Sequence, residues 1–481
     1  MKKALLLLLA AVMLLLPLAG CKNKKPDPED ETTSPVSYEG DDLGDKKFDG
    51  EFTVFSRVET DYEYKGSETG GSVDQAVYKR NASVEERLGV SINLITSVGG
   101  WDQRAEFLGK CRAEVMGGGT GGYDLISSHS VYLGTLGTEG LAIDLTTLPA
   151  VNMQKLWWNQ NLYDALNING HVYHMIGDIG YTIYEYLQVM YVNETKFESV
   201  GNDLNELYEL VEDGEWTYTK LFEYAATYGS GVGDDGDGNY GLLTNVHAFR
   251  ASVMAQDSYV YRRDENGRFY YPDSIPDKLL NIVKQAMVQY KEKDNILFHS
   301  AWDDGDEAET PIFNSGRALF YSQVIGKAQK IRDALSDRYG ILPLPKYDVL
   351  QDHYMSLCRD TVTAVMVPTT TKNQEKTGYC TEAMAMYGYN LIRPAYYETT
   401  LKVRQFDDPR YGKILDTIRD GLTYEAIESY TLKDCPNVDD YVVNCLTGNT
   451  EPNTVHSWGV ERAKKVINEF YTKMENRGLM D

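Results

Sequence analysis

An acidic, glycine-rich turn carries the residues that most suggest metal chemistry. Asp235, Asp237 and Asn239 have the one-three-five spacing with which an EF-hand loop supplies its first calcium ligands. Tyr240 stands where that loop needs glycine, and Val246, at the twelfth position, is not an acid. A structural calcium ion and a solvated turn therefore both stay open, and we expect no other cofactor.

Motifs of known catalytic chemistry are missing from the sequence. It contains no GxSxG, HExxH or Walker A pattern. The glycine-rich segment 117–122 lacks the Lys-Ser/Thr pair of a phosphate-binding loop, so we expect it to turn a helix into a strand. Carboxylates are so abundant that some pair always has glycosidase spacing, which makes such a pair uninformative. We therefore expect a protein that is not an enzyme.

Composition excludes further classes of function. The 481 residues include 72 acidic and 47 basic ones, and the net charge is −25. Such a chain repels phosphate backbones and anionic lipid, so nucleic acid is not an expected partner. Anionic ligands are disfavoured unless arginines cluster locally. The 36 tyrosines suit hydroxyl-rich ligands, although they also fill half-buried surface. The length predicts two or three domains.

The N-terminus predicts the location of the protein. Two lysines precede an apolar run over 4–16, which is shorter than the roughly 20 residues that span a bilayer. We expect residues 1–20 to be a secretory signal peptide. Residues 18–21 resemble a bacterial lipobox, which implies a lipid-modified Cys21 and anchoring to the cell membrane on its extracytoplasmic face. An ordinary signal peptide is the alternative.

The segment that follows and the other cysteines add two expectations. The remainder of 21–47 is polar and charged, so we expect a disordered linker and a folded body that starts near Phe48. Five cysteines remain after Cys21, and an odd number cannot form a complete disulfide framework. A bridge between Cys435 and Cys445 stays open.

The body alternates strand and helix patterns. Apolar spacing predicts a helix over 72–88, with Ser72 and Gln75 as a capping box and Gly89 just past its end. Further strands are expected over 52–56, 90–95, 123–127, 187–192, 318–321 and 362–367, and further helices over 101–116, 204–211, 217–228, 278–291, 375–389 and 460–473. This order predicts an α/β fold with parallel sheets. Ligands of such sheets bind beyond the carboxyl ends of the strands, which makes 57–64, 99–101 and 128–132 a candidate rim.

The order of these elements resembles the extracellular solute-binding lipoproteins of bacterial ABC importers, in the carbohydrate-binding group related to maltose-binding protein. The resemblance spans about residues 50–475 and is carried by short motifs at 80–90, 122–127, 169–178, 189–193, 213–217, 313–320, 340–346 and 367–368. It implies a two-lobed periplasmic-binding-protein-like fold (type II), each lobe a mostly parallel sheet flanked by helices. We expect the N-terminal lobe to hold 48–184 and 361–405, and the C-terminal lobe to hold 185–360 and 406–481.

A sugar needs aromatic faces for its C–H surfaces and polar planar side chains for its hydroxyls. The residues expected to contact ligand are Ser128, His129, Tyr132, Asp178, Tyr184, Tyr321, Gln323, Arg359 and Asp360. The first three follow the third strand, and Tyr321 ends a second-lobe strand, both positions that contact ligand in the resembling family. Other roles stay open: loop packing for His129 and Tyr132, a hinge hydrogen bond for Asp178, and a mutual ion pair for Arg359 and Asp360.

Tryptophans are a second source of stacking surfaces. Trp157, Trp158, Trp302 and Trp458 could each serve, but single tryptophans more often belong to the core. Trp216 lies in the family's helix-start motif, so we expect it to be structural.

The resemblance implies a monomer that captures a small-molecule solute, an oligosaccharide by preference, and delivers it to a membrane-embedded ABC permease. A receptor of the same fold for a peptide or other polar solute is the alternative. A surface polysaccharide-binding protein without an importer is a third reading.

Overall fold

The computed structural model describes residues 38–229, 238–300, 308–401, 410–431 and 434–480. The chain divides into two units, Met1–Tyr38 and Glu39–Asp481. The expected signal peptide, Cys21, Asp235, Asp237 and Trp302 lie outside the described residues. Within the described ranges, no helix has both the length and the apolar character that a bilayer crossing requires.

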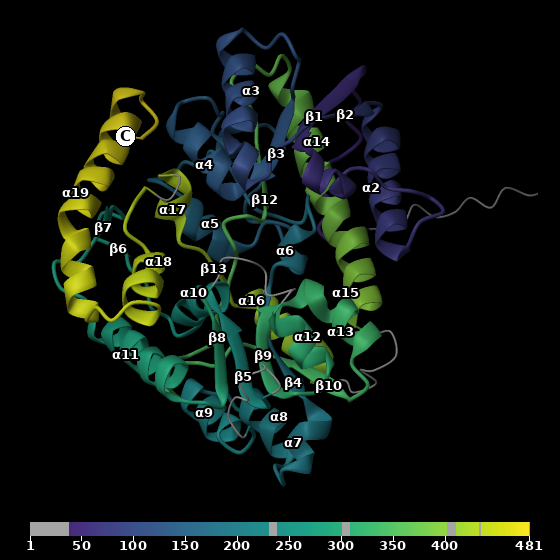
Figure 1. Ribbon diagram of the computed structural model, residues 1–481. Helices are drawn as coiled ribbons and strands as arrows, with labels where there is room; N and C mark the ends of the chain where they lie inside the picture. Colours follow the sequence, from purple (N-terminus) through teal and green to yellow (C-terminus); the bar gives the residue numbers. More distant parts are fainter. Residues whose placement is uncertain (1–37, 230–237, 301–307, 402–409, 432–433, 481) are drawn as a thin grey trace, which may run out of the picture. The chain divides into compact units, whose positions relative to one another are not determined.

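The first sheet has four strands in the order β12-β3-β1-β2 (Figure 1). Its strands are β1 (Glu51–Arg57), β2 (Ser91–Ser97), β3 (Leu125–His129) and β12 (Thr363–Met366). The strand β1 pairs in parallel with β2 and β3, and β12 is antiparallel to β3. Six of the seven residues of β1 are buried, as expected of a strand covered on both faces. All four strands were predicted from the sequence.

Helix α2 (Ser72–Leu88) has the predicted bounds. It ends because Gly89 adopts a left-handed φ of 73°, which costs glycine little. Its start differs from the expected capping box by one residue. The Asp74 carboxylate accepts the Gly71 N–H at 3.2 Å, while the Gln75 amide donates to the Gly70 carbonyl at 2.8 Å.

The second sheet has the order β10-β4-β9-β5-β8. Its strands are β4 (Gln188–Asn193), β5 (Tyr240–Asn245), β8 (Ile296–His299), β9 (Ala318–Val324) and β10 (Tyr339–Leu342). The strand β5 is parallel to β8 and β9, whereas β4 is antiparallel to β9 and β10. Sequence patterns predicted β4 and β9 but missed β5 and β8, each of which directly follows a polar segment.

Helices surround both sheets (Figure 1). They are α3 (Arg104–Met116), α4 (Ser130–Thr138), α5 (Gln160–Leu166), α6 (Thr182–Glu185), α7 (Glu194–Ser199), α8 (Leu204–Glu212), α9 (Tyr218–Ala225), α10 (Val246–Ala255), α11 (Asp277–Glu292), α12 (Glu309–Asn314), α13 (Ala328–Ala334), α14 (Gln374–Tyr387), α15 (Arg393–Leu401), α16 (Arg410–Asp420), α17 (Ala426–Tyr430), α18 (Val438–Tyr441) and α19 (Pro452–Asn476). Two short strand pairs, β6 (Arg262–Arg263) with β7 (Phe269–Tyr270) and β11 (Ser356–Leu357) with β13 (Leu422–Thr423), complete the fold.

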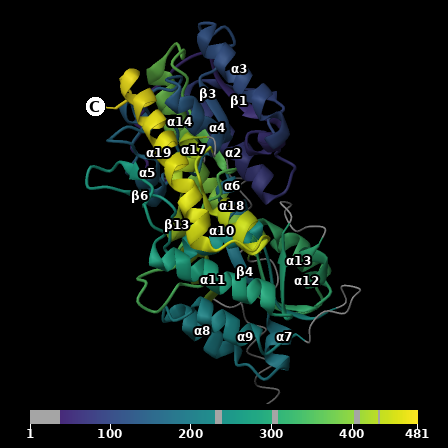
Figure 2. The ribbon, with the colours of Figure 1, turned by 60° about the vertical axis from the view of Figure 1, so that its left-hand side comes forward.

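The C-terminal part of the chain contacts elements around both sheets. Helix α17 packs on α4, where Ser429 Oγ donates to the Ser130 carbonyl at 2.7 Å. Helix α19 packs on α11 and reaches α4 at its end, where the Arg477 guanidinium donates to the Thr138 carbonyl at 2.6 Å. Figure 2, with α19 at the front, shows this helix running beside α17 and α18. The assignment of 406–481 to the second lobe did not anticipate the contacts with α4.

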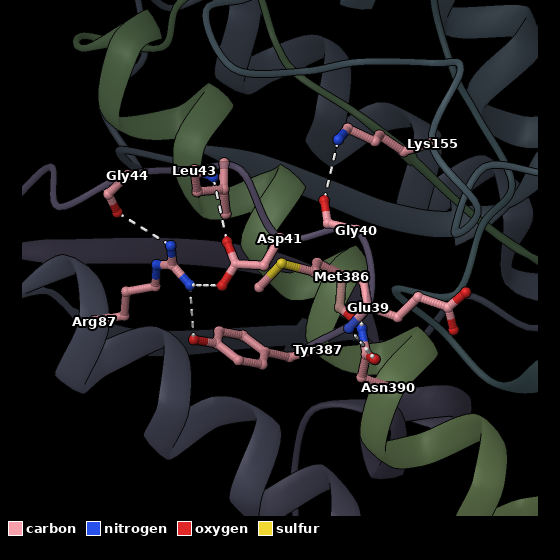
Figure 3. Close-up of polar contacts among 10 residues, drawn as sticks. All are labelled: Glu39, Gly40, Asp41, Leu43, Gly44, Arg87, Lys155, Met386, Tyr387 and Asn390. Carbon is pink, nitrogen blue, oxygen red and sulfur yellow. Dashed lines mark hydrogen bonds and ion pairs between the residues drawn. The ribbon is translucent and has the colours of Figure 1, made fainter. Parts of the chain in front are cut away.

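The segment 39–47 differs from the expected linker because it contacts the folded body (Figure 3). The Glu39 N–H donates to Asn390 Oδ1 at 3.0 Å, and the Lys155 ammonium donates to the Gly40 carbonyl at 3.0 Å. Asp41 forms an ion pair with Arg87 of α2. Leu43 is only 6% exposed, so one apolar side chain anchors a segment whose composition is otherwise polar.

All five cysteines among the described residues are buried free thiols: Cys111, Cys358, Cys380, Cys435 and Cys445. The bridge between the last two, which the sequence left open, is therefore not present in the structure.

Candidate functional site

The carboxyl edge of the first sheet brings together five of the predicted contact residues. The strand β3 ends at His129, which pairs with Thr363 at the start of the antiparallel β12. Backbone hydrogen bonds extend this pairing, from the Ser130 N–H to the Val362 carbonyl at 3.0 Å and from the Val131 N–H to the Asp360 carbonyl at 3.2 Å. The members of this group are Ser128, His129, Tyr132, Arg359 and Asp360.

Aromatic rings line this edge beside His129. The rings of His129 and Tyr132 lie 4.8 Å apart, and the Tyr132 hydroxyl donates to the Gly100 carbonyl at 3.2 Å. Trp101 lies 6.1 Å from the Tyr132 ring and is 42% exposed. Trp101 was part of the expected rim but was not singled out as a contact. The Arg104 guanidinium lies over the Trp101 ring at 5.1 Å, and the exposed part of the indole offers apolar surface that a sugar ring could contact.

The protonation states at this edge follow from burial. Burial lowers the pKa of His129 well below its usual range, and the charge of Arg57 lowers it further. The imidazole is therefore neutral near pH 7. Burial raises the pKa of Tyr132 to about 12, so its hydroxyl keeps its proton. Both groups can form hydrogen bonds with a neutral solute.

Arg57 ends β1 at the centre of the same edge. Its side chain is 3% exposed, and among the described residues its buried Nε has no hydrogen-bond partner and its guanidinium forms no ion pair. Burial lowers its pKa, and Glu63 and Glu59 are the nearest opposing charges. Sequence reasoning placed Arg57 only within the rim range 57–64. The pattern signal for it was a charged residue at the end of a buried strand.

The two neighbouring carboxylates bind other donors. Glu59 accepts the backbone N–H of Gly99 at 3.1 Å and of Gly100 at 3.0 Å. Glu63 accepts the Thr182 N–H at 2.8 Å and the Thr363 hydroxyl, and burial raises its pKa. Both carboxylates therefore fix loops around the site, and neither forms an ion pair with Arg57.

Asp360 pairs with Arg250 rather than with its sequence neighbour Arg359. Arg250 lies on α10, directly after β5 of the second sheet, and its guanidinium is 3.8 Å from the Asp360 carboxylate. The same guanidinium is 2.6 Å from Glu428 and 3.0 Å from Asp439. Arg359 instead lies over the Tyr186 ring at 5.5 Å. A charged cluster thus joins the first-sheet edge to the helix that leaves the second sheet.

Tyr321 and Gln323 lie in the interior of the second lobe rather than beside His129. The Tyr321 hydroxyl is 2.8 Å from Thr310 Oγ1, and the Gln323 amide donates to it at 3.1 Å. Tyr321 is 0% exposed. At the carboxyl edge of the same sheet, the side-chain amide nitrogens of Gln188 and Asn245 have no hydrogen-bond partner among the described residues.

Asp178 and Tyr184 form a separate buried pair, in which the Tyr184 hydroxyl donates to the Asp178 carboxylate. Burial raises the pKa of Asp178 to about 6. The Tyr184 ring lies 5.7 Å from Tyr396 and 5.4 Å from Tyr397 of α15. The Asp178 carboxylate is therefore bound by a tyrosine side chain of the same segment.

The tryptophans divide between core and surface. The indole N–H groups of Trp157 and Trp158 donate to one carboxylate, Glu382, at 2.9 and 3.0 Å. Trp216 is fully buried and donates to the Pro343 carbonyl at 3.0 Å. Trp458 is 60% exposed on α19. In the described part of the chain, no cluster of three or more His, Cys, Asp or Glu residues is arranged to hold a metal ion.

A pocket of about 380 Å³ lies on the other side of Tyr424, whose hydroxyl donates to Ser130 Oγ at 2.9 Å. Its walls include Tyr259, Tyr261, Arg263, Phe269 and Glu425. The pocket is therefore aromatic and polar, and Tyr424 separates it from the first-sheet edge.

Comparison with known families identifies the class of protein. The family described as bacterial extracellular solute-binding protein matches residues 83–379. Because this match covers more than half of the chain, the protein belongs to that family of extracellular binding proteins. A comparison with curated proteins finds no match.

Solved structures support the same class through the fold. The sugar-binding protein MalE of Xanthomonas citri is 9% identical, with a TM-score of 0.58 over 88% of this chain and 99% of that chain. The galacto-N-biose-/lacto-N-biose I-binding protein of an ABC transporter from Bifidobacterium longum is 13% identical, with a TM-score of 0.55 over 88% and 98%. The GacH receptor of Streptomyces glaucescens is 12% identical, with a TM-score of 0.54 over 88% and 100%. The two-lobed α/β fold that the sequence implied is confirmed.

Proposed function

We propose that the protein is the substrate-binding component of an ABC importer and captures an oligosaccharide between its two lobes. The proposal includes a lipid anchor at Cys21, a permease as partner, a monomeric state and the lobe boundaries given above. It includes no catalytic step, and the acidic turn at Asp235, Asp237 and Asn239 is its one candidate calcium site.

The observation that carries the proposal is a set of buried polar groups without partners at the carboxyl edges of both sheets. Among the described residues these are Thr60 Oγ1, Ser128 Oγ, His129 Nδ1, Gln188 Nε2 and Asn245 Nδ2. A buried polar atom without a partner costs about 1–3 kcal/mol, and several such atoms at the two carboxyl edges favour a ligand that supplies hydrogen bonds there. A solute with many hydroxyls, beside the exposed Trp101 ring, satisfies this requirement.

The test is a thermal-shift and calorimetric panel on the purified protein. The panel contains neutral and acidic mono- and oligosaccharides, amino acids and short peptides, each with calcium and with a chelator. A ligand at 100 Kd stabilises the native state by about 2.7 kcal/mol. Saccharides are expected to raise the melting temperature, and Trp101→Ala is expected to weaken their binding.

Trp458→Ala is the matched control, because it removes another exposed indole from α19. Stabilisation by peptides with none by saccharides would reject the carbohydrate class. A calcium-dependent shift without solute would support an ion at the acidic turn.

A further inference from the structure

Arg57 is the strongest unexplained feature of the candidate site. A guanidinium carries five N–H donors and stays ionised, so it is expensive to bury without an acceptor. Arg57 is nevertheless 3% exposed, its buried Nε has no hydrogen-bond partner, and its guanidinium forms no ion pair within the described part of the chain. The cost of this arrangement points to an acceptor that is supplied from outside the chain.

The neighbouring residues keep the Arg57 side chain buried and without an ion pair. A methyl group on Gly99 would lie 2.6 Å from Arg57 Cγ and 2.8 Å from Cδ, so the absence of a side chain at Gly99 makes room for the arginine stem. Glu59, the carboxylate on the adjacent turn, is held by the Gly99 and Gly100 N–H groups instead. The site therefore keeps a carboxylate close to the guanidinium without neutralising it by contact.

Charges of both signs surround the imidazole of His129. Besides Arg57, the charged groups around His129 are Arg359 and Asp360, and the two arginines oppose protonation of the imidazole while the aspartate favours it. Asp360 itself faces Arg250. The neutral neighbours of the Arg57 guanidinium include Tyr132 and Tyr186. Two arginines, Arg57 and Arg359, thus lie near His129, and no carboxylate forms an ion pair with Arg57 in the described part of the chain, so an anionic group can bind here although the chain is acidic.

We propose that the solute is an acidic saccharide, whose carboxylate or sulfate group binds the Arg57 guanidinium while its sugar ring contacts the exposed side of Trp101. This inference rests on the proposed function and narrows its ligand class. A planar carboxylate matches the fork of a guanidinium through two parallel hydrogen bonds, and a sulfate ester supplies similar oxygens. Ser128 Oγ and His129 Nδ1, which have no hydrogen-bond partner among the described residues, can then bind sugar hydroxyls.

The first experiment compares matched ligands on the unmodified protein by calorimetry. Oligosaccharides that contain a uronic acid are tested against their neutral parents, and sulfated against unsulfated disaccharides. One hydrogen-bonded charge predicts a preference of about tenfold to a hundredfold for the acidic member. The preference is expected to weaken as salt rises. The uronate and sulfate arms distinguish the two sources of the anionic group.

Variants then test whether Arg57 causes the preference for acidic saccharides. Arg57→Gln is expected to remove it, so that acidic and neutral members bind within about threefold of each other. Gly99→Ala keeps the charge but displaces the arginine stem, and it is expected to reduce the preference as well. Arg338→Gln, a 60% exposed arginine paired with Glu198, makes the same change of net charge and is expected to leave the preference intact.

The outcomes separate this inference from the proposed function. Equal binding of acidic and neutral saccharides, unchanged in Arg57→Gln, overturns the inference and leaves a neutral-sugar receptor. Binding of inorganic sulfate as tightly as of any acidic saccharide overturns the saccharide part. Absence of binding by every saccharide rejects the proposed function itself.

Discussion

Arg250 offers a direct test of the ionic link between the first-sheet edge and the helix after β5. Its side chain is 11% exposed and faces Asp360, Glu428 and Asp439, whose side chains are 8%, 5% and 26% exposed. Burial lowers the pKa of Arg250, but the three carboxylates more than offset this and raise it. The variant Arg250→Met keeps most of the side-chain volume and removes the charge.

The expected loss of stability follows from the burial of the carboxylates that remain without their arginine partner. Removing one partner of a buried ion pair costs about 3–5 kcal/mol, because the other charge is left unpaired. Unfolding entropy scales with chain length, so in a folded body of this size about 1 kcal/mol corresponds to about 1 °C. We therefore expect the melting temperature of Arg250→Met to fall by about 3–5 °C at pH 7.5.

The pH dependence makes the prediction specific. Without Arg250, the clustered carboxylates gain from protonation in the folded state, so the variant's stability falls as pH rises. The difference from the unmodified protein should be largest at pH 7.5 and smaller at pH 5. The double variant Arg250→Met, Glu428→Gln should recover part of the loss. Calorimetry across this range tests the reasoning, and a difference below 1 °C, or one independent of pH, would refute it.

Three further predictions concern other buried positions. His174 lies 3.1 Å from Ser130 Oγ, and burial lowers its pKa to about 3. The free energy of unfolding should therefore fall by roughly 3 kcal/mol as pH is lowered from 7 to 4. The variant His174→Gln should show a flatter dependence of this free energy on pH over the same range. Burial raises the pKa of Glu382 to about 7, so stability should fall as pH rises from 4.5 to 7, and melting curves of Glu382→Gln should lack this slope. An added methyl group at Gly388 would lie 1.8 Å from the Asp178 carbonyl oxygen, so Gly388→Ala should lower the melting temperature by several degrees. The control is Gly412→Ala, because a methyl group there would have no atom within 4 Å, and this variant should not lower the melting temperature.

Local patterns predicted most of the elements around the first sheet. The bounds of α2 could be found because an apolar helical period meets a glycine at the left-handed position. Ser128, His129 and Tyr132 could be placed at the carboxyl edge of the first sheet because they end or follow a buried strand of a parallel sheet. The strand β5 was missed because all six of its residues are buried, so it shows no alternation, and it directly follows the acidic, glycine-rich turn.

Long-range contacts account for the features that the sequence did not reveal. Arg250 and Asp360 are far apart in the chain, and nothing local distinguishes Arg250 from an exposed helical arginine. Leu43 is one apolar residue in a polar stretch, and the segment around it contacts Arg87 and Asn390, which come later in the chain. The unpaired state of Arg57 is likewise visible only when Glu59 and Glu63 are seen to bind other groups.

The path of α19 has a mechanical consequence. Near its end, the Arg477 guanidinium and the Leu479 carbonyl bind α4 and Tyr173, and elsewhere the helix packs on α11. A relative rotation of the two sheets that preserves both sets of contacts has its axis close to this helix. Displacement then grows with distance from that axis, so side chains remote from α19 travel furthest while those beside it hardly move.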